Sequence, residues 1–251
     1  MHIPYGILSP QVMAVTGTAA APAVGWALWR VRRQYQERAV PVMGVLGAYL
    51  FAAQMINFPV TGGTSGHLLG AALATFVLGP APAVLVMTAV LVVQAVLFQD
   101  GAVPALGANI LNMAVVGVFT AHLAMRLWTG TVLRLAGGRK GTGAGIVCRR
   151  EPGGARLTLA GAGVAAFLSI LFPAAACAAE VAASRTYPLP LVLGAMTGVH
   201  ALIGIGEAAI TLSILQFLYR VRPDLLAGLP PVQTNGASGG RQIEMSLKSG
   251  S

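Results

Sequence analysis

The residue pair Met1-His2 places an α-amine, a main-chain amide and an imidazole in immediate succession. The amine and the His2 amide nitrogen would close a five-membered ring on a metal ion. The same amide nitrogen and His2 Nδ1 would close a six-membered ring, so three nitrogens would lie in one plane and leave one position open. A planar set of nitrogens is typical of Ni(II) or Cu(II) and unsuited to Zn²⁺, Mg²⁺ or Ca²⁺. The first two residues therefore predict a transition-metal site.

A fourth nitrogen donor can come from His67, which follows a stretch rich in Gly, Thr and Ser at residues 62–66. We expect His67 to open a helix, where the helix dipole disfavours the imidazolium and keeps the ring neutral. Four further residues are candidates for hydrogen bonds that orient these donors: Asn57, Thr64, Ser65 and His200. The alternative role of the first three is turn and cap chemistry, and that of the histidine is a structural hydrogen bond.

The composition indicates that membrane helices carry these residues. Hydrophobic residues make up 56% of the chain and charged residues only 9%, whereas soluble domains have ~25% charged residues. Residues 39–99 contain no Lys, Arg, Asp or Glu. This composition excludes both an ordinary soluble domain and a disordered chain. The formal net charge of +9 does not predict nucleic-acid binding, because no basic patch is interleaved with exposed aromatic residues.

We predict an all-α polytopic membrane protein with about seven transmembrane helices, because a hydrocarbon core of ~30 Å needs ~20 apolar residues per helix. The predicted spans are Gln11–Trp29, Val40–Asn57, His67–Leu78, Ala83–Gln99, Val103–Met125, Leu157–Ala179 and Leu189–Leu218. The third span is short and ends at a Gly-Pro-Ala-Pro turn. It therefore either tilts or forms part of a re-entrant segment.

Basic residues cluster in three places, Arg30–Arg38, Arg126–Arg156 and the chain from Arg220 onward. With seven spans all three clusters fall on one side of the membrane, and the positive-inside rule makes that side the cytoplasm. We therefore expect the N-terminus outside and the C-terminus in the cytoplasm.

The predicted organisation is one membrane domain followed by a tail. Residues 1–222 form the integral membrane, substrate-binding domain, with a metal-binding segment at 1–10 and a cytoplasmic basic loop at 126–156. Residues 223–251 are rich in Gly and Ser, and we expect them to be a disordered cytoplasmic tail.

Other polar residues in apolar surroundings are informative because burying them in a membrane is expensive. They are Asp100, Asn109, Asn112, Glu180 and Glu207. We expect the two asparagines to bridge helices. Glu207 requires a buried partner, which the sequence does not identify.

Four segments carry a family resemblance: MHIPYGILSP at the N-terminus, QMINFPVTGGTSGHLLGAALATFVLGP at 54–80, VQAVLFQDGAVPALGANILNM at 93–113 and HALIGIGEAAIT at 200–211. They resemble the CbiM/NikM family, the substrate-binding membrane subunits of energy-coupling factor transporters for cobalt and nickel. The resemblance implies that the metal is held by the Met1 amine, the amide and side chain of His2, and His67. The family usually has an acidic residue where this chain has Tyr5, which bears on the fine tuning of the site rather than on its ligands.

The resemblance also implies a function and partners. The chain would be a transport subunit without catalytic activity, in the inner membrane of a bacterium or archaeon, and Ni²⁺ or Co²⁺ would be its transported substrate. Its partners would be two cytoplasmic ATPases, a membrane coupling subunit and a small accessory membrane subunit, besides the lipid bilayer. The planar nitrogen set favours nickel over cobalt, but both metals remain open.

The alternative function is an intramembrane serine protease. Gly63-Thr64-Ser65-Gly66 resembles the serine loop of rhomboids, and His200 on a later helix would then act as the base. Against this interpretation, Ser65 precedes the histidine-bearing segment in an outer loop, and the N-terminal Met-His pair has no role.

Overall fold

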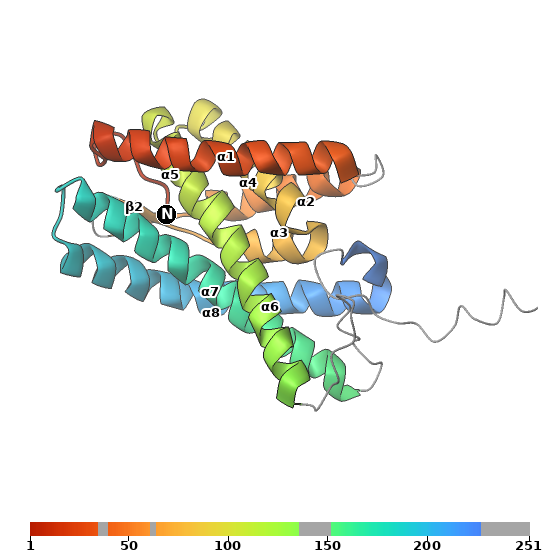
Figure 1. The fold of residues 1–251 in the computed structure, drawn as a ribbon. Helices are drawn as coiled ribbons and strands as arrows, with labels where there is room; N and C mark the ends of the chain where they lie inside the picture. Colours follow the sequence, from red (N-terminus) through yellow and green to blue (C-terminus); the bar gives the residue numbers. More distant parts are fainter. Residues whose placement is uncertain (35–39, 61–63, 136–151, 227–251) are drawn as a thin grey trace, which may run out of the picture.

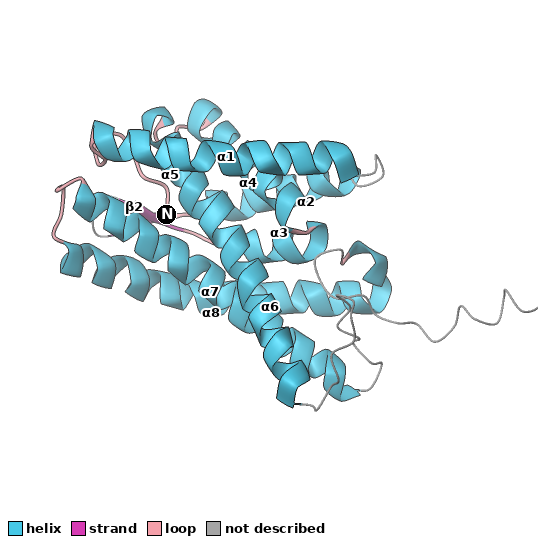
Figure 2. Ribbon diagram, viewed as in Figure 1, coloured by secondary structure: helices cyan, strands magenta, loops and turns pink. Residues whose placement is uncertain are grey.

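The computed structural model describes residues 1–34, 40–60, 64–135 and 152–226, and most of them are helical (Figure 2). The long helices are α1 (Pro10–Gln34), α2 (Val40–Met55), α4 (Pro80–Leu97), α6 (Gly117–Leu135), α7 (Pro152–Ala183) and α8 (Leu189–Val221). The shorter helical elements are α3 (Ala71–Leu78), η2 (Val103–Ala105), α5 (Leu106–Asn109), the π-helical segment η3 (Ile110–Val116) and η4 (Pro223–Leu225). The only strands among the described residues are β1 (Phe58–Val60) and β2 (Thr64–Gly66).

The helices form a bundle around the short helix α3 (Figure 1). Helices α7 and α8 lie side by side along one side of the bundle, and α1 and α2 pack against α4 on the other. All eight residues of α3 are buried, and this helix contacts α4, α6, α7 and α8. A short helix whose single polar side chain, Thr75, bonds to the Ala71 carbonyl within the helix therefore forms the centre of the core.

The all-α membrane fold is confirmed. Five segments of the described chain are long and apolar enough to cross a membrane, and Val40–Met55 is a shorter apolar helix. The segment predicted as the third span is different, because α3 has eight residues and rises by only about 12 Å. Its N-cap Gly70 has a positive φ of 75° and its C-cap Gly79 one of 83°. These two glycines, with Pro80 behind the second, end the helix on both sides, and the preceding residues 67–70 form an irregular loop.

The predicted basic loop at 126–156 is partly helical. Helix α6 continues to Leu135 and α7 begins at Pro152, so only residues 136–151 lie between them, outside the described residues. Most of the predicted tail, residues 227–251, also lies outside them.

The basic ends of the helices gather at one end of the bundle. Arg32 and Arg33 lie in the last turn of α1, and Arg220 lies in the last turn of α8. Both ends point to the right in Figure 1, whereas the start of α1 and the turn between α7 and α8 lie on the left. The bundle thus has a basic end and an end with few charges, as the sequence predicts.

A short hairpin interrupts the segment between α2 and α3. Strands β1 and β2 pair in antiparallel fashion, with Phe58 opposite Gly66 and Val60 opposite Thr64. A Cβ at Gly66 would lie 2.8 Å from Phe58 Cε2, so a larger residue there would have to displace the Phe58 ring. We expected only a loop at this place. The hairpin is functionally important because β2 carries Ser65 and leads directly into His67.

Candidate metal centre

The N-terminal segment folds back into the bundle instead of lying on its surface. Met1 and Ile3 have no exposed surface and His2 is only 3% exposed. In Figure 1 the terminus lies among the helices, close to β2. The apolar side chains of Met1 and Ile3 explain the burial, because they join the hydrophobic core.

Hydrogen bonds to the main chain hold this segment in place. The Ile3 amide donates to Asn109 Oδ1 at 2.9 Å, and the Ala102 amide donates to the Ile3 carbonyl at 3.2 Å. Further along the segment, Thr186 Oγ1 donates to the Ile7 carbonyl at 2.6 Å. Asn109 was expected to bridge two helices; instead its carbonyl oxygen fixes the N-terminal segment.

The Met1 amine is a neutral donor near pH 7. It donates hydrogen bonds to the carbonyl oxygen and the hydroxyl of Ser65, and the His2 amide donates to the same hydroxyl at 3.2 Å. Burial lowers the pKa of the amine from 8.0 to about 5. Its lone pair is therefore available to a metal ion without competition from a proton at neutral pH.

The His2 ring has one nitrogen bonded and one free. Nε2 lies 3.1 Å from Gln94 Oε1, and a carbonyl oxygen only accepts, so Nε2 carries the proton and Nδ1 the lone pair. Burial lowers the pKa of His2 to about 3, so the ring is neutral. Nδ1 is buried without a hydrogen bond and lies 3.4 Å from Asp100 Oδ1. The Nδ1 lone pair and the carboxylate oxygen repel each other, and a cation bound between them would remove this repulsion.

Asp100 belongs to a small polar group at the edge of the site. Asn57 Nδ2 donates to Asp100 Oδ2 at 3.0 Å, and burial raises the pKa of this carboxyl group above its usual value. Asn57 therefore reaches the site through Asp100 and not through a histidine.

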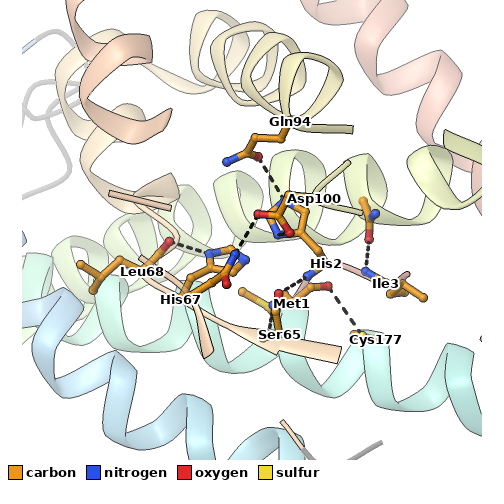
Figure 3. A network of polar contacts seen from close by, with 11 residues as sticks. Met1, His2, Ile3, Ser65, His67, Leu68, Gln94, Asp100 and Cys177 are labelled. Atoms are coloured by element: carbon orange, nitrogen blue, oxygen red, sulfur yellow. Dashed lines mark hydrogen bonds and ion pairs between the residues drawn. The ribbon is translucent and has the colours of Figure 1, made fainter. Parts of the chain in front are cut away.

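His67 presents its Nε2 to the same place. Nδ1 lies 2.8 Å from the Leu68 carbonyl and donates to it, so Nε2 carries the lone pair; this nitrogen is buried and has no hydrogen-bond partner. The rings of His67 and His2 are 4.6 Å apart between centroids and inclined by 33° (Figure 3). We expected a helix dipole to keep His67 neutral, but α3 begins only at Ala71. Burial, not the dipole, is the main cause that lowers the pKa of His67.

Four nitrogens therefore belong to neighbouring groups in this part of the bundle: the Met1 amine and the His2 amide, which both contact Ser65 Oγ, and His2 Nδ1 and His67 Nε2 of two adjacent rings (Figure 3). Among the described residues, no group of three His, Cys, Asp or Glu side chains is arranged to hold a metal ion. Side chains of these types alone thus do not form a complete ligand set among the described residues. Main-chain nitrogens would complete it through the five- and six-membered chelate rings that residues 1 and 2 can form.

A glycine next to His2 leaves room for the imidazole. Gly101 has a φ of 84°, and a Cβ there would lie 2.8 Å from Asn109 Nδ2 and 3.1 Å from His2 Cδ2. Any larger residue would therefore strain the backbone and displace two groups of the site.

Not all of the predicted supporting residues meet these donors. Ser65 contacts both Met1 and His2, whereas Thr64 Oγ1 lies 2.8 Å from Met196 Sδ. His200 Nδ1 donates to the Met196 carbonyl at 2.7 Å. Among the contacts of the described residues, none joins Ser65 to His200, so the serine–histidine pair that a protease needs receives no support.

The sequence analysis missed one polar residue near the site and the partners of another. Gln94 is fully buried and sets the tautomer of His2; the available signal was a glutamine within an apolar segment. Glu207 was noticed, but not its partners, which are the main-chain amides of Leu69 and Gly70. No side-chain pattern encodes such a partner, because every residue except proline has an amide N–H.

The chain is similar to proteins that are described as metal transporters. Residues 2–225 match the CbiM family, described as the cobalt uptake substrate-specific transmembrane region. A putative metal transport protein of Haloquadratum walsbyi is 37% identical over 226 residues, which cover 90% of this chain and 93% of that protein. The fused nickel transport protein NikMN of Rhodobacter capsulatus is 36% identical, and the match covers 90% of this chain but 64% of that longer protein.

The fold is also similar to that of a solved transporter. A crystal structure described as a truncated transition metal transporter has a TM-score of 0.75 and 31% identity, and the match covers 88% of this chain and 99% of that one. The cobalt transport protein CbiM of Geobacter sulfurreducens is 29% identical, with 96% of this chain and 65% of that protein covered.

Proposed function

The chain belongs to the CbiM family of cobalt-uptake membrane proteins, and from this premise we propose that it captures Ni²⁺ or Co²⁺ at the outer face of the membrane for ATP-driven uptake by an energy-coupling factor transporter. The observation that carries the proposal is the convergence of His2 Nδ1 and His67 Nε2, both buried and without a hydrogen bond, beside the Met1 amine. Transition-metal ions are the ions that best suit a set of amine, amide and imidazole nitrogen ligands.

The donor set bears on the choice of metal. Four nitrogens of which three belong to fused chelate rings favour a planar arrangement, and this geometry suits Ni(II) better than Co(II). The relatives include proteins named for nickel transport and others named for cobalt transport. We propose nickel as the preferred ion, with cobalt as the second substrate.

Titration of the purified full chain with NiCl₂ and CoCl₂ tests this proposal. An intact-mass measurement first establishes that Met1 is retained with a free amine. We expect one Ni²⁺ per chain and the absorption spectrum of planar, diamagnetic Ni(II). A correctly processed, folded chain that binds neither metal would overturn the proposal.

Energy for uptake would come from partner subunits. The glycine-rich segment Gly137–Gly141 lacks the spacing of a phosphate-binding P-loop. We propose two cytoplasmic ATPases, a membrane coupling subunit and a small accessory membrane subunit as partners. Purification through a C-terminal tag from cells that express the whole gene set should recover ATPase activity that the chain alone does not have.

The basic end of the bundle supports the orientation in an inner membrane. The arginine-bearing ends of α1 and α8 would face the cytoplasm, and the turn at 184–188 the outside. A reporter fused after Arg222 should then read cytoplasmic and one inserted at 184–188 external. The same location for both would refute capture at the outer face.

A further inference from the structure

Glu207 is a buried carboxylate in the middle of α8, only 2% exposed. Its Oε2 accepts a hydrogen bond from the Leu69 amide at 2.7 Å, and its Oε1 accepts one from the Gly70 amide at 2.6 Å. Each carboxylate oxygen thus binds one of two consecutive main-chain N–H groups. Among the residues that the structure describes, Glu207 takes part in no salt bridge. A carboxylate placed inside a membrane bundle to bind a loop requires an explanation.

The same loop is held from the opposite side by α2. Gln54 Nε2 donates to the Leu69 carbonyl at 2.7 Å, and Gln54 is fully buried. Gly70 lies against Leu50, because a Cβ at this glycine would be 2.0 Å from Leu50 Cδ2. Residues 67–70 have no regular secondary structure, so these side-chain contacts replace the hydrogen bonds that a helix or strand would provide.

These contacts lead directly to His67. The two amides bound by Glu207 follow His67 by two and three residues, and the intervening Leu68 carbonyl accepts the proton of His67 Nδ1 at 2.8 Å. The Leu68 carbonyl therefore orients the ring, and Glu207 fixes the main chain on which both groups lie. A shift of α8 would move the loop and, with it, the Nε2 that faces His2.

We propose that Glu207 is the positioning residue for His67: it binds the 67–70 loop to α8 and so determines how closely His67 Nε2 approaches the N-terminal nitrogens. The inference rests on the proposed function, since it assigns His67 as a metal ligand. Glu207 does not touch the metal; it acts through the main chain of the loop.

The substitution Glu207→Gln tests the proposal. The glutamine side chain keeps one acceptor oxygen but turns an NH₂ group toward the second amide, so one of the two hydrogen bonds is lost. Removing a residue that orients a metal ligand weakens binding by roughly 10–100-fold, and we expect a loss of this size in NiCl₂ titrations of the purified full chain. The spectrum of bound Ni(II) should change as well, because one nitrogen is displaced.

Testing Glu207→Gln in a chain that already carries His67→Ala distinguishes a positioning role from a general disturbance of the fold. In a His67→Ala chain, Glu207 has no ligand to position, so Glu207→Gln should cause no further loss of affinity. A further loss of similar size in that background, or unchanged affinity in the His67-containing chain, would overturn the proposal. If Glu207→Gln does not fold, Glu207→Asp, which keeps the charge on a shorter side chain, is tested by the same two criteria.

Glu180→Gln is the matched control. Glu180 is also a carboxylate within a long helix, but its Oε2 accepts from Asn112 Nδ2 at 2.7 Å and not from the loop. We expect its Ni²⁺ affinity to equal that of the unmodified chain. An equal loss in both variants would mean that any carboxylate replacement weakens the site, and it would overturn the assignment.

Hydrogen–deuterium exchange of the metal-free chain distinguishes this proposal from the function on which it rests. Glu207→Gln should accelerate exchange in the peptide that contains residues 67–70, and Glu180→Gln should not. Failure of the unmodified chain to bind metal would refute the proposed function, whereas unchanged exchange at 67–70 would refute the positioning role.

Discussion

Residues 1–9 and residues 67–70 approach the same point, but they contribute to it differently. In the proposed site the N-terminal segment would supply three nitrogens from two adjacent residues, and the loop would supply only His67 Nε2. The segment is held through its main chain by Asn109 and Thr186. The loop is held by buried side chains of two helices, Gln54 and Glu207.

This difference indicates which region should contribute most of the affinity for the metal, and which region should make metal binding depend on the packing of the helices. A chelate between neighbouring residues has its geometry set by covalent bonds, so it needs the fold only for burial. A single donor from a loop is as precise as the contacts that hold the loop. We therefore expect the N-terminal segment to dominate binding and the loop to make binding sensitive to the position of α8.

Blocking the N-terminal amine should have the largest effect. An N-terminal extension converts the Met1 amine into an amide and removes one ring of the chelate, and His2→Ala removes the other. The membrane helices of both variants should still insert, although an extension must displace the buried residues 1–3. Both variants should lose specific Ni²⁺ binding in titrations of purified protein. A tag after Ser251 is the control and should bind like the untagged chain. Normal affinity in an uncleaved N-terminal fusion would exclude the amine as a ligand.

His67→Ala should have the second largest effect. The variant keeps the N-terminal chelate and loses one donor, so affinity should fall by roughly tenfold or more. The Ni(II) spectrum should show that another group occupies the fourth position. A folded variant with unchanged affinity would show that His67 is not a ligand and that the 67–70 loop does not contribute to the site.

Asn109→Leu should weaken the N-terminal segment to a smaller extent. The Ile3 amide would lose its acceptor, and a buried N–H without a partner costs about 1–3 kcal/mol. We expect Ni²⁺ affinity to fall, but by less than it falls in His67→Ala. Asn112→Leu, three residues further along in the π-helical segment η3, is the control, since Asn112 bonds to Glu180 instead. Similar losses of affinity in the two variants would show that damage to the helix, not the lost Ile3 contact, is responsible.

Tyr5→Asp should have the smallest effect. The resemblance suggested that an acidic residue at position 5 tunes the site, but Tyr5 is 83% exposed and lies in the turn that follows the buried residues 1–3. Exposed substitutions usually change free energies by about 0.5 kcal/mol or less, so Ni²⁺ affinity should stay within about twofold. A larger gain would show that position 5 approaches the metal once it is bound.

Most of the fold could be predicted from the sequence. The long apolar segments and the clusters of arginine predict membrane helices with one basic end, because hydrophobicity and charge act on each segment separately. The hairpin at 58–66 and the short α3 were not predicted. Their form depends on contacts such as Gly66 against Phe58 and Gly70 against Leu50, which join residues of different elements.

The sequence by itself determined the ring sizes of the chelate that Met1 and His2 can form, because ring sizes depend only on covalent connectivity. It also singled out His67. Only the tertiary structure decided that the terminus turns inward and that burial rather than a helix dipole lowers the pKa of His67. It also decided that Gln94 bonds the His2 ring and that Glu207 binds the amides of Leu69 and Gly70. These outcomes depend on which main-chain and side-chain groups meet in a dry interior. That pairing is a property of the packed bundle and not of any single segment.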